Sequence, residues 1–70
     1  MEMTNVSSSN ISQIGYDPSN RSLHVKFLNG GLYEYTNVPP EVYQNLRSAS
    51  SVGSYFHQAI KGEYPATKIG

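Results

Sequence analysis

Apolar and polar residues alternate along the first half of the chain. Leu23, Val25 and Phe27 are separated by single polar residues, a period of two that is typical of a half-buried strand. Turn-forming residues lie on both sides, at Asp17-Pro18-Ser19-Asn20 and at Asn29-Gly30-Gly31. The pattern predicts a three-stranded antiparallel meander with strands at residues 10–17, 22–27 and 32–36.

The second half of the chain has a helical period. Pro39-Pro40-Glu41 is typical of a helix start, and the first predicted helix has its apolar residues at Val42, Leu46 and Ala49. The serines of residues 48–51 interrupt this pattern and can cap a second helix. That helix has its apolar residues at Val52, Phe56, Ala59 and Ile60 and is expected to end at Gly62. The order β-β-β-α-α predicts an α+β fold with both helices packed on one face of the sheet.

The two ends of the chain are poor in apolar residues. We expect residues 1–9 to be a disordered lead-in, residues 10–64 to form a single domain, and residues 65–70 to be a frayed tail.

The loop between the second and third strands decides which way Tyr33 and Tyr35 point. A two-residue loop, Asn29-Gly30, would place Lys26 opposite Tyr33 and leave both tyrosines on the open face. A three-residue loop, 29–31, would place Phe27 opposite Tyr33 and Val25 opposite Tyr35, with Lys26 opposite Glu34. We favour the second register because it puts apolar residues together and pairs the acid with the base.

The first hairpin gives a register in which Asp17 lies opposite Ser22 and Ile14 opposite Val25. The predicted core is then Ile14, Tyr16, Leu23, Val25, Phe27, Tyr33, Tyr35, Val42, Leu46, Val52, Phe56, Ala59 and Ile60. The other face of the sheet carries Gln13, Gly15, His24, Lys26, Glu34 and Thr36.

Composition narrows the class of protein. The chain has 70 residues, zero net charge and no cysteine, so a disulfide or a thiolate metal site is excluded. It has no apolar stretch of the length that a membrane helix or a signal peptide needs, and we expect a cytoplasmic location.

Catalytic and metal-binding patterns are not present in the sequence. The two histidines, His24 and His57, fall on a strand and on a helix that do not bring them together. No nucleophile, base and acid occur in a known catalytic spacing. We therefore expect no enzyme activity, no metal, no cofactor and no small-molecule substrate.

Two features could contact a nucleic acid. Ser51 and Gly53 open the second helix, where unpaired backbone N–H groups can receive a phosphate, and His57 and Lys61 follow on its polar face with Arg47 near its start. The alternative is that Ser51 only caps the helix and that Gly53 allows close packing. Tyr33 and Tyr35 could stack on bases, as strand aromatics of RNA-binding sheets do, but the favoured register places them in the core.

An ordered set of motifs resembles the KTSC domain. Tyr33-Glu34-Tyr35 is followed by Val38-Pro39 and then by Ser51, Gly53 and Tyr55-Phe56. The resemblance runs from about Asn10 to Tyr64. The family is named for a C-terminal extension of some lysyl-tRNA synthetases and also occurs as small stand-alone bacterial proteins, for which RNA binding is suggested. The resemblance marks Tyr33, Tyr35, Tyr55 and Phe56 as family residues, which we expect to lie in the core.

Two functions follow as hypotheses. The first is an accessory module that binds tRNA or single-stranded RNA through Ser51, Gly53, His57, Lys61 and Arg47. The second is a module that binds an unidentified protein through a sheet edge or the outer sheet face.

Overall fold

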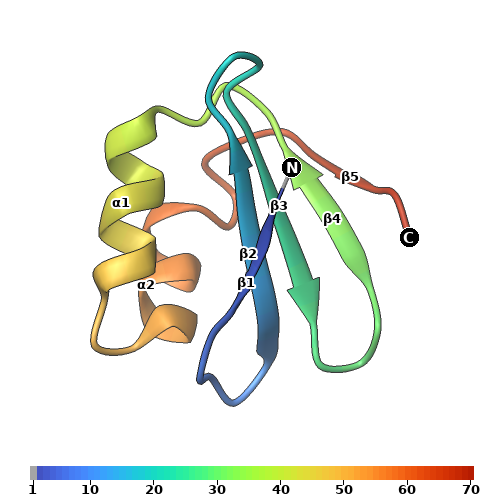
Figure 1. The fold of residues 1–70 in the computed structure, drawn as a ribbon, viewed down its shortest axis with the longest axis vertical. Helices are drawn as coiled ribbons and strands as arrows, with labels where there is room; N and C mark the ends of the chain where they lie inside the picture. The colour runs from blue at the N-terminus through green and yellow to red at the C-terminus, as the bar shows by residue number, and fades with distance from the viewer. Residues whose placement is uncertain (1) are drawn as a thin grey trace.

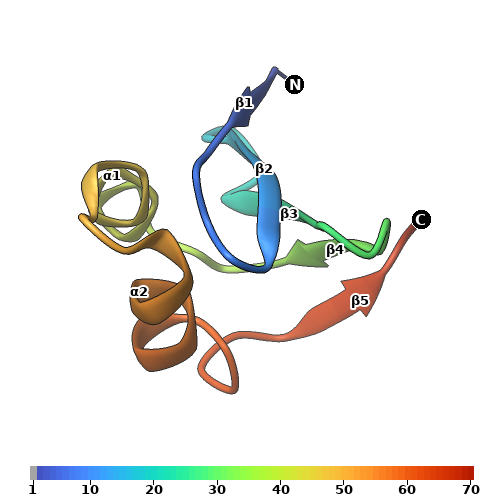
Figure 2. The same cartoon turned by 90° about the horizontal axis from the view of Figure 1, so that it is seen from below.

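The computed structural model describes residues 2–70 as a five-stranded antiparallel sheet in the order β1-β2-β3-β4-β5, with two helices (Figure 1). The strands are β1 (Met3–Asn5), β2 (Ile11–Asp17), β3 (Ser22–Phe27), β4 (Leu32–Tyr35) and β5 (Ala66–Lys68), and the helices are α1 (Pro40–Ser48) and α2 (Val52–Ala59). Both helices lie on one side of the sheet, which we call the inner face (Figure 2). This arrangement confirms the α+β class.

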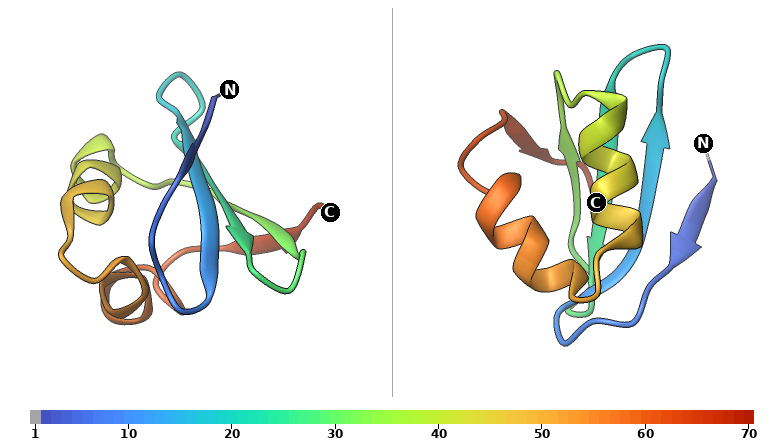
Figure 3. Two further views of the ribbon diagram at one scale, coloured as in Figure 1. Left: turned by 60° about the horizontal axis from the view of Figure 1, so that its bottom comes forward. Right: turned by 90° about the vertical axis from the view of Figure 1, so that its left-hand side faces the viewer.

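The prediction of only three strands was wrong. β1 pairs with β2, and β5 pairs with β4, so the two ends of the chain form the two edges of the sheet (Figure 3). The sequence pattern missed both because each has three residues, mostly polar and exposed. Such strands are held by hydrogen bonds to a neighbour and not by an apolar face of their own. Of the predicted lead-in 1–9, Met1 lies outside the described residues.

The first hairpin has the predicted register. Asp17 lies opposite Ser22, and Ile14 lies opposite Val25. A bulge lies between Ile11 and Gln13, where the pairing with β3 shifts by one residue. Because of this bulge Ile11 and Ile14 both point into the core, and neither is exposed to solvent.

The second hairpin has neither of the two registers considered. Val25 pairs with Tyr33 and Leu23 with Tyr35, because the three-residue loop is 28–30 and not 29–31. Gly30 provides the positive φ of this loop, at 97°. The shift relative to the favoured register is two residues, so every side chain stays on the expected face. Tyr33 and Tyr35 therefore do face the helices.

The core lies between the inner face and the helices. Its fully buried residues include eight that the sequence predicted and two that it did not, Ile11 and Val38. Tyr16, Phe27, Tyr33, Val42 and Ala59 are only half-buried at its margin. Two of these residues, Phe27 and Tyr33, lie close to the loop between β3 and β4.

Both helices start where the sequence predicted. Pro39 precedes α1 without a side-chain cap, whereas the Ser51 hydroxyl accepts from the Ser54 N–H at 3.3 Å and caps α2. α2 ends at Ala59, earlier than expected, and Gly62 makes a left-handed turn after it.

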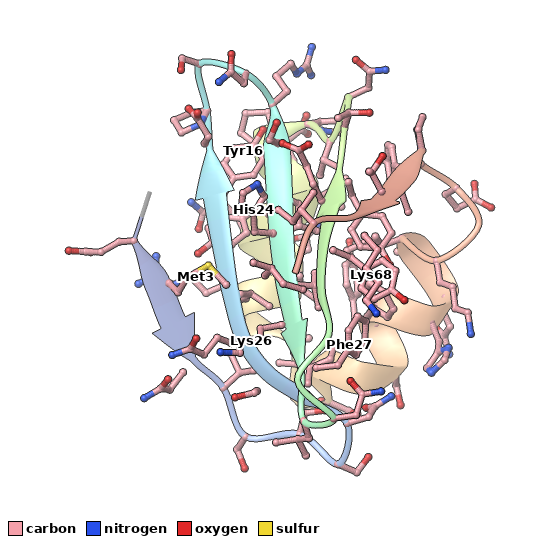
Figure 4. The ribbon with its side chains drawn as sticks, turned by 90° about the vertical axis from the view of Figure 1, so that its right-hand side faces the viewer. Met3, Tyr16, His24, Lys26, Phe27 and Lys68 are labelled. Atoms are coloured by element: carbon pink, nitrogen blue, oxygen red, sulfur yellow. The ribbon has the colours of Figure 1, made fainter. Side chains whose placement is uncertain are left out.

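The opposite side of the sheet, the outer face, has no helix over it. Met3, His24 and Lys26 lie there, toward the viewer in Figure 4, with the helices behind the sheet. His24 Nε2 is 3.3 Å from Glu34 Oε2, which is the one ion pair among residues 2–70.

Candidate functional site

A cleft of about 330 Å³ opens on the inner face, between α2 and the β3–β4 hairpin. We call it the aromatic cleft, and its lining residues are Asn10, Phe27, Asn29, Tyr33, Tyr35, Phe56, His57 and Lys61. They come from the residues before β2, from β3, β4 and the loop between them, and from α2 and the turn after it. The site is therefore assembled only when the whole chain is folded.

The floor of the cleft is a chain of aromatic rings in edge-to-face contact. The ring centroids of Phe27 and Tyr33, of Phe27 and Phe56, and of Tyr35 and Phe56 are 5.6, 5.6 and 5.5 Å apart. Their interplanar angles lie between 73° and 84°. Edge-to-face pairs are favourable because the positive edge of one ring meets the negative face of the next. The faces and edges of these rings give the cleft a largely apolar floor.

The two strand tyrosines differ in exposure. Tyr35 is 6% exposed, and burial, together with the nearby Tyr33, raises the pKa of its phenol. Tyr33 is half-buried and lies at the mouth of the cleft. Among residues 2–70 neither phenol hydroxyl has a hydrogen-bond partner, in contrast to Tyr16, which donates to the Val38 carbonyl. The prediction that both tyrosines are core residues is confirmed for Tyr35 and holds only in part for Tyr33.

Polar groups form the rim of the cleft. His57 and Lys61 are four residues apart, so they lie on one side of α2 and of the turn that follows it. Asn29 Oδ1 accepts from the Gly31 N–H at 3.0 Å, and Asn10 Oδ1 accepts from the Ser8 hydroxyl at 3.3 Å. These bonds hold each amide in place and leave its NH₂ group without a partner among the described residues.

A second hollow, of about 410 Å³, shares the lining residues Asn29 and Tyr33 with the cleft. We call it the side hollow, and it is lined by Asn29, Gly30, Gly31, Tyr33, Lys68 and Gly70. Lys68 lies directly opposite Tyr33 in the pairing of β4 with β5, so both belong to the inner face. The cleft and the side hollow share Asn29 and Tyr33, and we call the two together the groove; Lys61 lines the cleft and Lys68 lines the side hollow.

The groove carries positive charge although the whole chain is neutral. No aspartate or glutamate among residues 2–70 lines either hollow, whereas Lys61, His57 and Lys68 do. Glu34 lies on the outer face beside His24, and Asp17 lies in the first hairpin turn. Glu63 follows Lys61 by two residues, but it is not among the lining residues either.

The structure divides the predicted contact residues into two groups. His57 and Lys61 line the aromatic cleft together with the family residues Tyr33, Tyr35 and Phe56. Ser51, Gly53, Arg47 and Tyr55 do not line it. Ser51 is a cap, and Gly53 leaves room for neighbours, because a Cβ there would lie 3.0 Å from Asn10 Oδ1 and 3.1 Å from Ser8 Oγ. Arg47 is exposed in the last turn of α1, and Tyr55 is half-buried against the core.

Sequence reasoning missed three lining residues, Asn10, Asn29 and Lys68. Asn10 was predicted as the first residue of the strand at 10–17, Asn29 as a turn residue, and Lys68 as part of the tail. One signal for the side hollow was present in the sequence, the run Asn29-Gly30-Gly31. Its two glycines have no side chains to fill the hollow that they line.

Neither a histidine pair nor a cluster of metal-binding side chains occurs among residues 2–70. His24 and His57 lie on opposite faces of the sheet. Residues 2–70 hold no group of three or more His, Asp or Glu side chains placed to bind a metal ion. Neither helix of the described part has the length and apolar character needed to cross a membrane.

The chain is similar to small proteins over nearly its full length. The sequence profile of the KTSC domain matches residues 7–64. The crystal structure of a KTSC domain protein from Yersinia pestis superposes with a TM-score of 0.96 at 46% identity, covering 99% of this chain and 97% of that one. An uncharacterized protein of Stutzerimonas stutzeri is 42% identical over 64 residues, which is 91% of this chain and 90% of the relative.

The chain is also similar to one part of a much larger protein. A lysine–tRNA ligase of Nostoc is 43% identical over 49 residues, which is 70% of this chain but only 9% of the ligase.

Proposed function

This chain belongs to the KTSC domain family, and we propose that it is a small RNA-binding module whose contact surface is the groove of the aromatic cleft and the side hollow. In this proposal Lys61, His57 and Lys68 contact phosphates and Tyr33 contacts bases. The module has no catalytic role of its own.

The observation that carries the proposal is the composition of the groove. Aromatic rings, amide side chains and lysines line the two hollows that share Tyr33, and no acid of residues 2–70 is among their lining residues. Proteins that bind single-stranded nucleic acid combine a positive groove along the backbone with aromatic side chains for the bases. The net charge of zero is consistent with this because the acids lie elsewhere on the surface.

The relatives give independent support. Lysine–tRNA ligases act on a tRNA, and one of them contains a segment 43% identical to most of this chain. A segment that occurs both in a tRNA ligase and in small proteins of about this length fits an accessory role in contacting RNA.

The remaining predicted contacts extend the surface. Gly53, His57 and Lys61 are spaced by four residues, so they follow one side of α2. The eight residues of α2 span about 12 Å at roughly 1.5 Å per residue. An RNA strand that leaves the cleft along α2 would therefore pass Ser51 and then Arg47.

The test is the salt dependence of binding. Fluorescence anisotropy with a labelled single-stranded RNA, and with tRNA, should give an affinity that falls as salt increases, since each phosphate contact releases a counterion. Lys61→Ala should weaken binding and lower the slope of log affinity against log salt by about one. Lys26→Ala is the matched control because Lys26 is an exposed lysine on the outer face.

Two results would contradict the proposal. One is the absence of binding to either RNA at low salt with protein at high micromolar concentration. The other is an equal loss of affinity in Lys61→Ala and Lys26→Ala, since a groove-specific contact must distinguish the two faces of the sheet.

A protein-binding function is the second candidate. It is favoured by the outer face, over which no helix lies, and by two large apolar side chains, Leu28 and Ile69, which are 60% and 46% exposed. Crosslinking in a lysate should then capture one partner that His24→Ala releases and Lys61→Ala retains. Recovery of chaperones alone would count against this candidate.

A further inference from the structure

The shape and chemistry of the aromatic cleft indicate a more specific ligand than RNA in general. Resting on the proposed function, we propose that the cleft takes one unstacked nucleobase, stacked against Tyr33 and hydrogen-bonded by Tyr35, so that the protein selects single-stranded over double-stranded RNA.

The size of the cleft fits one small planar group. Its volume of about 330 Å³ is at the lower end of the roughly 300 to 1,000 Å³ of small-molecule sites. α2 bounds it on one side, the β3–β4 hairpin on another, and Asn10 lies near the start of α2. A base within a duplex is covered on both faces by its neighbours, so only a base free of its stack can enter.

The floor of the cleft holds an unused polar group. Tyr35 lines the cleft, and the residue is only 6% exposed. Its hydroxyl has no hydrogen-bond partner among residues 2–70. Among the described side chains no fully buried polar atom lacks a hydrogen-bond partner, so this hydroxyl still reaches the solvent in the cleft. A guest that bonds to it takes the place of water there, whereas an apolar guest would leave the hydroxyl without a partner. A tyrosine phenol with the ordinary pKa of 10.0 is already protonated at neutral pH, and burial raises the pKa of Tyr35 further, so its hydroxyl can donate to a guest.

The rim supplies further donors suited to the edge of a base. The Nδ2 groups of Asn10 and Asn29 are free, because the hydrogen bonds of both amides use Oδ1. Nucleobase edges carry ring nitrogens and carbonyl oxygens that accept from such amides. The groove thus offers one hydroxyl and two amides around an aromatic floor.

Tyr33 is placed to serve as the stacking surface. Its ring makes an edge contact with Phe27 and lies close to Gly31, which leaves room for it because a Cβ there would lie 3.3 Å from the ring. It lines both the aromatic cleft, together with Lys61, and the side hollow, together with Lys68. A base beside Tyr33 therefore has a cation available for the phosphate on each side of it.

The experiment uses a short RNA with one 2-aminopurine, whose fluorescence is quenched when it stacks on an aromatic ring. We expect the full chain to quench the probe in the single strand and to bind the same strand in a duplex at least tenfold more weakly. Tyr33→Leu should abolish the quenching and weaken binding by about 5- to 150-fold, since stacking of a base on an aromatic side chain has that value. Tyr64→Leu is the matched control, as Tyr64 is half-buried and outside the groove.

A second variant tests the floor without disturbing the packing. Tyr35→Phe removes only the hydroxyl and should weaken binding of the single strand by about 2- to 12-fold, as the loss of one hydrogen bond does. Tyr33→Phe keeps the ring and should quench as the wild-type protein does.

The outcomes separate this inference from the proposed function. Equal affinity for single strand and duplex, with the dependence on Lys61 intact, would overturn the base-binding cleft and leave a phosphate-binding surface. Quenching that persists in Tyr33→Leu would also overturn it. Absence of any RNA binding would contradict both the proposed function and the base-binding cleft.

Discussion

At the scale of single residues, Tyr16 joins two parts of the fold. Its hydroxyl donates to the carbonyl of Val38, a residue with no exposed surface in the connection between β4 and α1. Its ring stacks on Tyr43 of α1, with centroids 5.0 Å apart and planes 11° from parallel. The residue thus fixes β2, the connection and α1 relative to one another.

Removing this hydroxyl should lower stability. Tyr16→Phe keeps the stacked ring but leaves the buried Val38 carbonyl without that donor, so we expect a loss of about 1 kcal/mol in the free energy of unfolding. Urea denaturation followed by tyrosine fluorescence measures it. Tyr43→Phe is the control, because its hydroxyl has no partner among the described residues, and a loss of equal size there would contradict the assigned bond.

The burial of Ile11 and Val38 could not be predicted from the alternation of apolar and polar residues. Ile11 is three residues before Ile14, so strict alternation places them on opposite faces, and only the bulge between Ile11 and Gln13 brings both inside. Val38 lies after the last predicted strand, and its N–H donates to the Arg21 carbonyl of the first hairpin. Its burial follows from tertiary contact and has no local signal.

At the scale of elements, the two hairpins explain where sequence reasoning succeeded. The turn at 17–20 consists of polar and turn-forming residues, so its ends are clear and the register of β2 and β3 was predicted correctly. The second loop begins with Leu28, an apolar residue that resembles a strand position. The loop was therefore placed one residue too late, although its length was correct.

The first hairpin turn should give the protein a specific sensitivity to acid. The carboxylate of Asp17 accepts from the Ser19 hydroxyl at 2.7 Å and from the Asn20 amide at 2.8 Å. These bonds, the Ser19 hydroxyl first, lower the pKa of Asp17 below its ordinary value of 3.8. A lowered folded-state pKa stabilises the fold above pH 3.8, and this contribution is lost as pH falls through the folded-state value.

We therefore expect the melting temperature of the wild-type protein to fall more steeply below pH 3.8 than that of Asp17→Asn. Thermal unfolding followed by circular dichroism over a pH series measures the difference. Glu2→Gln, which removes an exposed carboxylate near the N-terminus, serves as the control and should follow the wild type. Parallel curves for wild type and Asp17→Asn would show that the turn does not stabilise the fold through its charge.

At the scale of the whole molecule, the candidate site could be predicted only in part. His57 and Lys61 were found because one helix carries them at a fixed spacing, and the tyrosines because one strand does. Asn10, Asn29 and Lys68 come from three separate places in the chain, and only the assembled fold brings them to one groove. The distribution of charge likewise cannot be read from a net charge of zero.

The place of β5 has a dynamic consequence. This strand is joined to β4 only after residues 36–65, which include both helices, and all three of its residues are exposed. It can therefore detach while the buried core remains intact, since local opening needs only the free energy of the contacts that it breaks.

Hydrogen exchange should reveal this opening. The amides of Leu32 and Thr36 donate to the Gly70 and Pro65 carbonyls, at 3.0 and 3.1 Å, and should exchange long before the amide of Val38, which donates to Arg21. Equal protection of the three amides would mean that the sheet unfolds only as a unit. If the early exchange is found, β5 detaches from β4 and pairs with it again in the folded protein. Lys68 can then contact a guest only while β5 is paired.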